Sequence, residues 1–313
     1  MNQQRTGSAF SGWGFINLQK PAGWTSHDCV GKLRRLLGLK KIGHGGTLDP
    51  MATGVLPIAV GKATRLLQYL PKQKSYQGIV RFGVKTTTDD LEGEVITQKA
   101  CSTLTLAEIQ RVLPDFFGTI TQIPPAFSAI QRDGKRLYEL ARQGIAVDVP
   151  SRQVEIYDLQ IKAWQPGDFP ELTLEICCGE GTYIRAIARD LGERLGVGAT
   201  LAGLTRTRSG GFDLEESISL EDIAAQRETG VFACLEPDQA LAHLPAVVLN
   251  EAQVTQWSYG QKISWDVALA DPLGEPLAVY DQAHNCLGVG EFRPSKDNPH
   301  ERVLAGRVVL IGR

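Results

Sequence analysis

The strongest constraint in the sequence is the segment of residues 41–50, which reads Lys-Ile-Gly-His-Gly-Gly-Thr-Leu-Asp-Pro. Its glycines permit backbone angles closed to other residues and let a ligand approach the main chain. Pro50 disfavours the helical region for the residue before it, so we expect Asp49 in an extended or turn conformation with its carboxylate projecting. The apolar residues 55–60 predict a buried strand. The segment therefore predicts a carboxylate displayed on a loop and backed by a strand.

The alternative is a plain turn, because glycine-rich segments ending in Asp-Pro often serve only to let the aspartate bond its own backbone. The residues before the loop predict a helix that starts with the capping-box spacing of Thr25 and Asp28 and ends near Gly38. From Cys29 to Leu48 the chain has five Lys or Arg residues and no acid. Such a run is typical of a solvated helix face, but beside a displayed carboxylate it favours attraction of a polyanion.

Two further residues, Tyr76 and Arg185, are candidates for a functional site that contains Asp49. Tyr76 lies on a predicted strand over residues 74–83, where a tyrosine usually serves packing. Arg185 lies at the start of a helix predicted over residues 186–195, where the helix dipole favours anions rather than cations. A carboxylate partner would explain that position, and a surface arginine without a role is the alternative.

Composition limits the possible classes of protein. The formal net charge of -2 does not indicate nucleic-acid binding, so any such role must come from local basic surface. The six cysteines contain no C-x-x-C pair, which argues against a zinc site and a secreted disulfide framework. Residues 1–12 are polar and lack a signal pattern, and no apolar run approaches the length of a membrane helix. We expect a cytoplasmic protein with a disordered N-terminal tail.

Residues 43–57 read Gly-His-Gly-Gly-Thr-Leu-Asp-Pro-Met-Ala-Thr-Gly-Val-Leu-Pro, which resembles the active-site signature of the TruB family, the bacterial tRNA pseudouridine-55 synthases. The segments around Tyr76, Arg185 and Leu204 also resemble motifs of this family. The resemblance covers nearly all of residues 13–313. It implies that the chain isomerises uridine-55 in the TΨC loop of tRNA to pseudouridine, using a catalytic aspartate and base flipping.

The resemblance also implies the fold class and the domains. We expect an α+β pseudouridine synthase fold, a mixed and mainly antiparallel sheet with flanking helices, over residues 13–243. From about residue 244, short strands alternate with turn signals, which indicates a small β-barrel-like module. Residues 244–313 are similar to a PUA domain, a module that binds RNA.

Three residues are catalytic by resemblance. Asp49 matches the catalytic aspartate, and the sequence leaves open whether it acts as nucleophile or as base toward the sugar. Arg185 matches the arginine that pairs with this aspartate, and its cation would keep Asp49 ionised. Tyr76 matches a tyrosine that stacks on the target base. The chemistry requires no redox change, so we expect no cofactor and no metal.

Five residues are substrate-binding by resemblance. His44 matches a histidine that fills the stack vacated by the flipped base, although a histidine in a glycine loop is more often only solvated or locally bonded. Leu204 matches an apolar residue of the base pocket, and Tyr183 lies beside the arginine. Lys20 lies in a Lys-Pro turn that resembles the first motif of the family, and Arg206 is a candidate phosphate contact.

Five positions depart from the family pattern. Gly45 stands where the family usually has Thr, and Thr47 where it usually has Ala. Thr87 replaces an Asp, in a loop that we expect to be peripheral. Phe127 replaces a Tyr and Gln131 a Lys, which leaves any RNA or structural role of these two positions open.

Two other classes of function stay open. A non-catalytic RNA-binding or folding factor would explain the basic run and the C-terminal module, and it would bind tRNA equally well without Asp49. A glycosidase or nucleosidase would also use a carboxylate, but it usually needs an opposed pair, and no second acid comparable to Asp49 is evident. The expected partner is the TΨC stem-loop of tRNA, with no membrane partner, and nothing in the sequence indicates an oligomer, so we expect a monomer.

Overall fold

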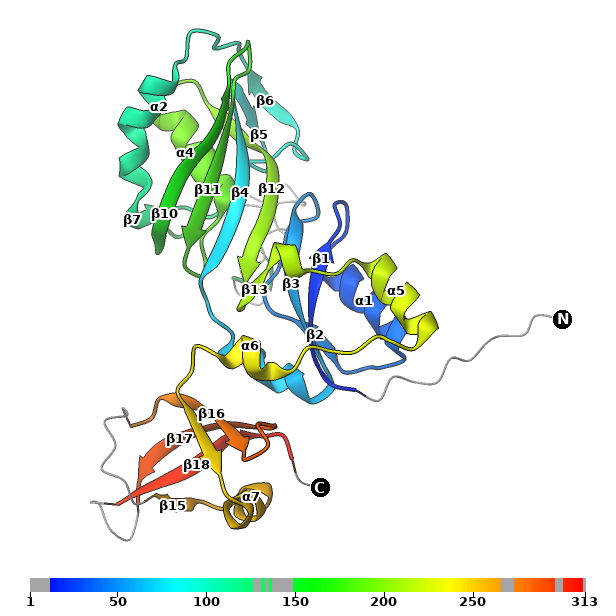
Figure 1. Ribbon diagram of the computed structural model, residues 1–313. Helices are drawn as coiled ribbons and strands as arrows, with labels where there is room; N and C mark the ends of the chain where they lie inside the picture. Colours follow the sequence, from blue (N-terminus) through cyan, green and yellow to red (C-terminus); the bar gives the residue numbers. More distant parts are fainter. Residues whose placement is uncertain are drawn as a thin grey trace, which may run out of the picture.

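The computed structural model describes residues 12–125, 131–132, 135–136, 149–265, 273–295 and 301–311. Within these residues, two larger sheets and several helices are arranged one after the other along the molecule (Figure 1). The helices and 3₁₀ helices are α1 (Ser26–Leu37), η1 (Gly61–Tyr69), α2 (Leu106–Val112), η2 (Leu113–Phe116), α4 (Ile184–Arg194), η3 (Leu214–Glu216), α5 (Leu220–Thr229), α6 (Pro237–Leu241) and α7 (Glu251–Ser258). In the described part of the chain, none of them is long and apolar enough to cross a membrane.

The larger sheet is mixed and mainly antiparallel, as the family resemblance implies. Among the described residues its strands run in the order β1-β3-β12-β4-β11-β10-β7, with β2 beside β3 and β13 beside β12. Among the strands that the structure describes in this sheet, only β3 and β12 are parallel, and they share two residue pairs. The strands are β1 (Gly14–Lys20), β2 (Ile42–His44), β3 (Thr53–Val60), β4 (Lys74–Phe82), β7 (Gly118–Gln122), β10 (Arg152–Gln165), β11 (Glu171–Cys178), β12 (Ala199–Ser209) and β13 (Phe212–Asp213). Two hairpins, β5 (Val84–Thr86) with β6 (Val95–Gln98) and β8 (Gln131–Arg132) with β9 (Lys135–Arg136), lie outside this sheet.

Local sequence signals explain the first helix. Thr25 caps α1, and Asp28 completes the predicted capping box. The helix ends at Gly38, whose φ of 68° is the left-handed conformation that glycine adopts without a steric penalty. The apolar face of α1 packs with α5 against β1 and β3, and the buried β3 confirms the strand predicted at residues 55–60 (Figure 1).

A second apolar core lies under the other half of the sheet. In Figure 1, α2 and α4 cover the same face of β10, β11 and β4. Their side chains form one buried cluster that includes Phe82, Ile109, Leu174 and Leu191. The two halves meet where β12 lies between β3 and β4, and the candidate site lies at this junction.

The C-terminal residues form a separate curled sheet, consistent with the small β module expected from the sequence. Within the described residues its strands run β14 (Ala246–Leu249), β16 (Pro276–Asp281), β17 (Cys286–Pro294), β18 (Arg302–Val309) and β15 (Ile263–Trp265). Trp257 of α7 is buried in its core and donates to the carbonyl of Leu287 at 3.0 Å.

The two sheets are joined by a shared apolar cluster. In it, Phe15 and Val55 of the first sheet pack with Val289 of the second sheet and with Leu310, which directly follows β18. Lys62 of η1 also donates to the carbonyl of Leu310 at 2.9 Å.

Candidate active site

The loop that carries Asp49 is held on both sides by the first residue of α1 and the turn before it. The backbone N–H of Leu48 donates to the hydroxyl of Ser26 at 2.9 Å, and the same hydroxyl donates to the carbonyl of Leu48 at 3.3 Å. One residue after Asp49, the carbonyl of Pro50 accepts a hydrogen bond from the N–H of Gly23 at 2.8 Å. The predicted display of the Asp49 carboxylate therefore rests on a loop with little freedom to move.

Lys20 strengthens this support from beneath the loop. Its side chain is fully buried, and its ammonium donates to the carbonyl oxygens of Pro21 at 2.8 Å, Trp24 at 2.5 Å and Pro50 at 3.1 Å. All three ammonium donors are therefore used inside the protein. The structure thus corrects the expectation of a substrate contact at Lys20, because its burial leaves no surface for a substrate to touch.

Arg206 has a similar position on the other side of the loop. It is fully buried, and its guanidinium donates to the carbonyl oxygens of Val55 at 2.7 Å, Thr47 at 3.3 Å and Gly46 at 3.3 Å. Its guanidinium also lies close enough to Tyr76 for its charge to act on the phenol. The expectation of a phosphate contact at Arg206 is corrected for the same reason as that at Lys20: the cation binds the Asp49 loop from inside the protein.

Gly54 permits the close approach of β3 and β12 that brings Arg206 to the loop. It has a φ of +99°, and a Cβ at this position would lie 2.2 Å from the carbonyl oxygen of Arg206. Only glycine satisfies both the left-handed conformation and the lack of space.

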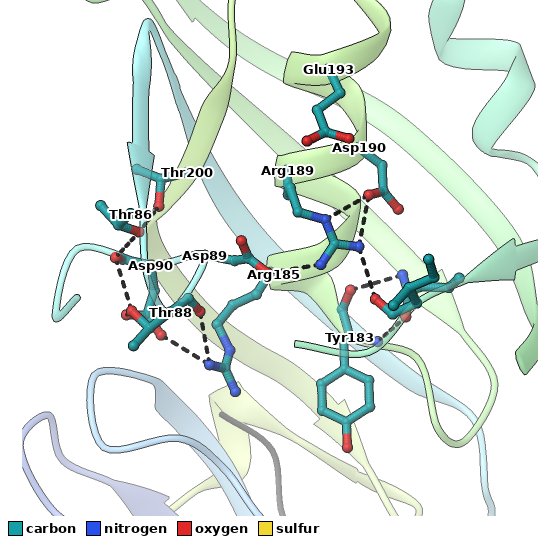
Figure 2. Close-up of polar contacts among 12 residues, drawn as sticks. Thr86, Thr88, Asp89, Asp90, Tyr183, Arg185, Arg189, Asp190, Glu193 and Thr200 are labelled. Carbon is teal, nitrogen blue, oxygen red and sulfur yellow. Dashed lines mark hydrogen bonds and ion pairs between the residues drawn. The ribbon is translucent and has the colours of Figure 1, made fainter. Parts of the chain in front are cut away.

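The cation at the start of α4 is explained by two carboxylates. The Nε of Arg185 lies 3.0 Å from Oδ2 of Asp49, and its Nη1 lies 3.3 Å from Oδ2 of Asp90. Nη1 also donates to the carbonyl of Thr88 at 3.0 Å (Figure 2). The side chains of Arg185 and Asp90 are 5% and 4% exposed, whereas that of Asp49 is 36% exposed. One buried arginine therefore joins a buried carboxylate to an accessible one.

The loop that supplies Asp90 was expected to be peripheral, and that expectation was wrong. Asp90 accepts from the hydroxyl of Thr88 at 2.5 Å and from the N–H of Glu92 at 3.1 Å. Its neighbour Asp89 has a φ of 60° and pairs with Arg189, one turn after Arg185 on α4, at 2.9 Å (Figure 2). Two acidic residues after a threonine run were the only sequence signal for this contact.

A cavity of about 170 Å³ opens beside the accessible carboxylate. It brings together five residues predicted from the sequence: Asp49, Tyr76, Tyr183, Arg185 and Leu204. Sequence reasoning missed other residues of its wall, among them Lys74, Thr182 and Ile184. Of the described residues that line this cavity, none is Lys20, His44 or Arg206.

The surroundings adjust the charge of the cavity residues. Burial raises the pKa of Asp49, the cation of Arg185 opposes this rise, and the negative charge of Asp90 adds to it. Burial also raises the pKa of Tyr76, which keeps its phenol neutral. A carboxylate whose pKa is set by burial and a specific charge partner inside a cavity is a candidate catalytic group.

Tyr183 is held in place through its backbone. The side-chain amide of Gln122 accepts from the N–H of Tyr183 at 2.8 Å and donates to its carbonyl at 3.0 Å. The guanidinium of Arg152 lies 5.6 Å from the centre of the Tyr183 ring, in the range of a cation–π contact. The ring is therefore fixed at the cavity wall.

His44 ends β2 and pairs with Ile58 of β3, outside the cavity wall. Burial lowers the pKa of His44, so its ring is neutral near pH 7. At the next residue, where the family usually has Thr, a Cβ on Gly45 would lie 2.7 Å from a methyl group of Leu70. Leu70 thus occupies the space of the missing side chain.

The other departures give less information. Phe127 and the side chain of Gln131 lie outside the described residues. Among the described residues, no group of three or more His, Cys, Asp or Glu side chains could hold a metal ion.

Three family models match successive parts of the chain. Residues 34–184 match the TruB family pseudouridylate synthase N-terminal domain, residues 185–241 the tRNA pseudouridylate synthase B C-terminal domain, and residues 245–298 the pseudouridine synthase II TruB C-terminal domain.

Curated relatives and solved structures agree with these matches. The chain is 54% identical over 303 residues to tRNA pseudouridine synthase B of Synechocystis sp., covering 95% of this chain and 99% of that protein. It is 53% identical over 280 residues to the protein of the same name from Trichormus variabilis, covering 90% and 94%. A solved Cbf5-Nop10-Gar1 complex contains a chain that superposes with a TM-score of 0.73 at 29% identity, covering 96% of this chain and 85% of that one. The fold is that of a pseudouridine synthase. The chain belongs to the TruB family of pseudouridylate synthases.

Proposed function

We propose that this chain isomerises uridine-55 in the TΨC loop of tRNA to pseudouridine, in the cytoplasm and without a cofactor. The observation that carries the proposal is the 3.0 Å contact between Arg185 and Asp49, an accessible carboxylate, in a cavity that also contains Tyr76 and Leu204. The curated relatives carry the name tRNA pseudouridine synthase B, which supports tRNA as the substrate.

The reaction breaks the bond between N1 of uracil and C1′ of ribose, rotates the base and joins C5 to C1′. The proton lost from C5 is balanced by the proton gained at N1. The ionised carboxylate of Asp49 is the reacting group that acts on the sugar. Arg185 orients this carboxylate and favours its ionised form.

The cavity walls hold the detached base. The neutral ring of Tyr76 stacks on uracil while it rotates, and Leu204 and the fixed ring of Tyr183 exclude water from the reacting atoms. Water would otherwise trap the cleaved sugar as an abasic product.

The uridine must first leave the RNA stack, at a cost of a few kcal/mol. We assign to the ring of His44 the role of filling the vacated space. Its lowered pKa fits this role, because a neutral ring stacks between bases without a charge to desolvate.

Lys20 and Arg206 act as positioning residues. Lys20 holds the carbonyl of Pro50, and Arg206 holds those of Gly46 and Thr47, so the two cations fix the Asp49 loop from opposite sides. This pre-organises the carboxylate before RNA binds.

The basic run supplies the surface for tRNA. Arg34 and Arg35 of α1 and the following Lys40 and Lys41 are exposed. They lead directly into the Asp49 loop, where cations attract the phosphate backbone. The C-terminal module, residues 244–313, extends this RNA surface as a PUA-like domain, and the protein acts as a monomer.

The test uses an unmodified tRNA transcript labelled with tritium at uridine C5. We expect wild-type protein to release tritium from one uridine of the TΨC loop, and Asp49→Asn to release none while its tRNA affinity stays within about three-fold. Asp115→Asn is the matched control, because this carboxylate is 51% exposed and pairs with Arg194 away from the cavity.

Other results would point to the other classes of function. Tight tRNA binding without release by wild type would favour an RNA-binding factor. Release of free uracil, measured by chromatography, would favour a nucleosidase. Asp90 lies near Asp49 but does not line the cavity in the described part of the chain, so it does not provide the opposed carboxylate that such an enzyme usually needs.

A further inference from the structure

Lys74 is a cation of the cavity wall that has no place in the chemistry described above. It is the first residue of β4, two positions before Tyr76, so both side chains point to the same face of the sheet. A Cβ built on Gly46 would lie 3.6 Å from the ammonium of Lys74. Lys74 therefore faces the Asp49 loop across the cavity.

The other cations around the cavity are used by the protein, whereas Lys74 is not. Lys20 and Arg206 bind backbone carbonyls, and Arg185 binds two carboxylates. The ammonium of Lys74 makes no hydrogen bond or ion pair with another described residue. Burial and the nearby cation of Arg206 both lower its pKa. A half-buried ammonium in this setting is stabilised when an anion enters the cavity.

The change in exposure along the start of β4 indicates which part of the RNA would supply this anion. The side chain of Lys72 is 68% exposed, Lys74 is half-buried, and Tyr76 is 8% exposed. Lys74 thus lies at the rim of the cavity, while Tyr76 lies at its floor. A base stacked on Tyr76 occupies the floor, so the sugar-phosphate backbone of the same nucleotide stays at the rim.

We propose, on the basis of the proposed function, that the ammonium of Lys74 binds a non-bridging oxygen of a phosphate that adjoins the target uridine. The contact is a charge-assisted hydrogen bond from a compact cation, which suits a phosphate oxygen. It anchors the flipped nucleotide by its backbone while the base is free to rotate.

The test measures binding of TΨC stem-loops in which one phosphate beside the target uridine is replaced by a neutral methylphosphonate. Fluorescence anisotropy is read in the Asp49→Asn background, so that no turnover occurs. Lys74→Gln removes the charge, Lys74→Arg keeps it, and Lys72→Gln removes the exposed neighbouring charge that pairs with Glu180 at 3.1 Å. Turnover of the unsubstituted stem-loop by the wild-type protein is measured separately by tritium release.

We expect Lys74→Gln to weaken binding of the unsubstituted stem-loop by about ten-fold, the size of a hydrogen bond to a charged group. One of the methylphosphonate substitutions should weaken RNA binding by the protein with Lys74 intact by about the same factor. It should weaken binding by Lys74→Gln less than about two-fold, because this variant already lacks the ammonium that contacts the phosphate. Lys74→Arg should retain most of the affinity, and Lys72→Gln should retain all of it.

The proposed contact is overturned if every methylphosphonate lowers the RNA affinity equally for Lys74→Gln and for the protein with Lys74 intact. It is also overturned if Lys74→Gln binds the unsubstituted stem-loop with unchanged affinity. A fold defect does not imitate the expected pattern, since each comparison uses two RNAs on one protein. If the coupling is found but the wild-type protein releases no tritium, the contact is supported and the proposed reaction fails.

Discussion

The ammonium of Lys20 lies 3.1 Å from the carbonyl oxygen of Pro50, the residue that follows Asp49. The lysine is fully buried, and its nitrogen contacts three main-chain carbonyl oxygens. Its contribution to the site is therefore the position of the Asp49 carboxylate rather than a contact with RNA.

We predict that Lys20→Met lowers kcat by about ten-fold or more with little change in KM, because the loop loses a fixing bond worth about 1.5–3 kcal/mol. Methionine retains most of the buried stem. Tritium-release kinetics check the split between kcat and KM, and Lys72→Met is the control. An increase in KM alone would assign Lys20 to substrate binding.

The pH dependence of the reaction follows from the raised pKa of Asp49. The ionised form reacts, so kcat/KM should fall as the pH drops through this pKa, and the fall should begin at a higher pH than for an ordinary aspartate. Arg185→Gln should move the acid limb to still higher pH, because the opposing cation is gone. Initial rates across the acid range, with stability verified at each pH, test both shifts.

Asp90→Asn should move the acid limb in the opposite direction. The negative charge of Asp90 raises the pKa of Asp49, so its removal lowers that pKa. We also expect about a ten-fold lower kcat at neutral pH, since Arg185 loses the carboxylate that anchors it. Asp89→Asn is the control, because asparagine tolerates its φ of 60° and Asp89 pairs with Arg189 instead. An acid limb at the same pH in Asp90→Asn and Asp89→Asn would contradict the effect of Asp90 on the pKa of Asp49.

Gly54→Ala should be strongly destabilising, by about 3 kcal/mol or more, because the new methyl group meets the backbone of β12. Gly23→Ala is matched in conformation, with a φ of +78°, but a Cβ there has nothing within 4 Å. It should cost only about 1–2 kcal/mol of backbone strain. The free energies of unfolding of both variants, measured in urea, separate backbone strain from the steric clash with β12. Equal losses of stability would show that β3 and β12 move apart at little cost.

Deleting residues 245–313 should lower the thermal midpoint of the remaining domain as well as its tRNA affinity. The deletion exposes the apolar cluster that the two sheets share, and it removes the carbonyl of Leu310 that accepts from Lys62. Calorimetry of the truncated protein tests the first effect. An unchanged midpoint would mean that the catalytic domain is stable by itself.

The groups that we propose to react were suggested by the sequence, because their motifs are short and local. The glycine loop before a proline left Asp49 open between a plain turn and a displayed carboxylate, and the family resemblance favoured the carboxylate. The anomalous cation at the start of a helix pointed to a carboxylate partner for Arg185. The capping box at Thr25 and the buried strand β3 are likewise encoded within a few residues.

The groups that position them were not predictable, because their roles depend on contacts between distant segments. Arg206 resembles a phosphate-binding residue until the fold buries it against the carbonyls of Gly46 and Thr47. Asp90 is one acid in a polar loop until that loop meets α4. Lys74 gave no signal at all, since a lysine at a strand end is ordinary. Burial decides each of these roles, and burial is a property of the tertiary structure.

The placement of β12 between β3 and β4 has a consequence for synthesis of the protein. Both neighbours leave the ribosome long before β12, and until it arrives their facing edges lack hydrogen-bond partners. The carbonyls of Gly46 and Thr47 in the Asp49 loop also lack their partner, the guanidinium of Arg206, until β12 is synthesised. We therefore expect the Asp49 loop of an unfinished chain to stay less ordered until this central strand is inserted.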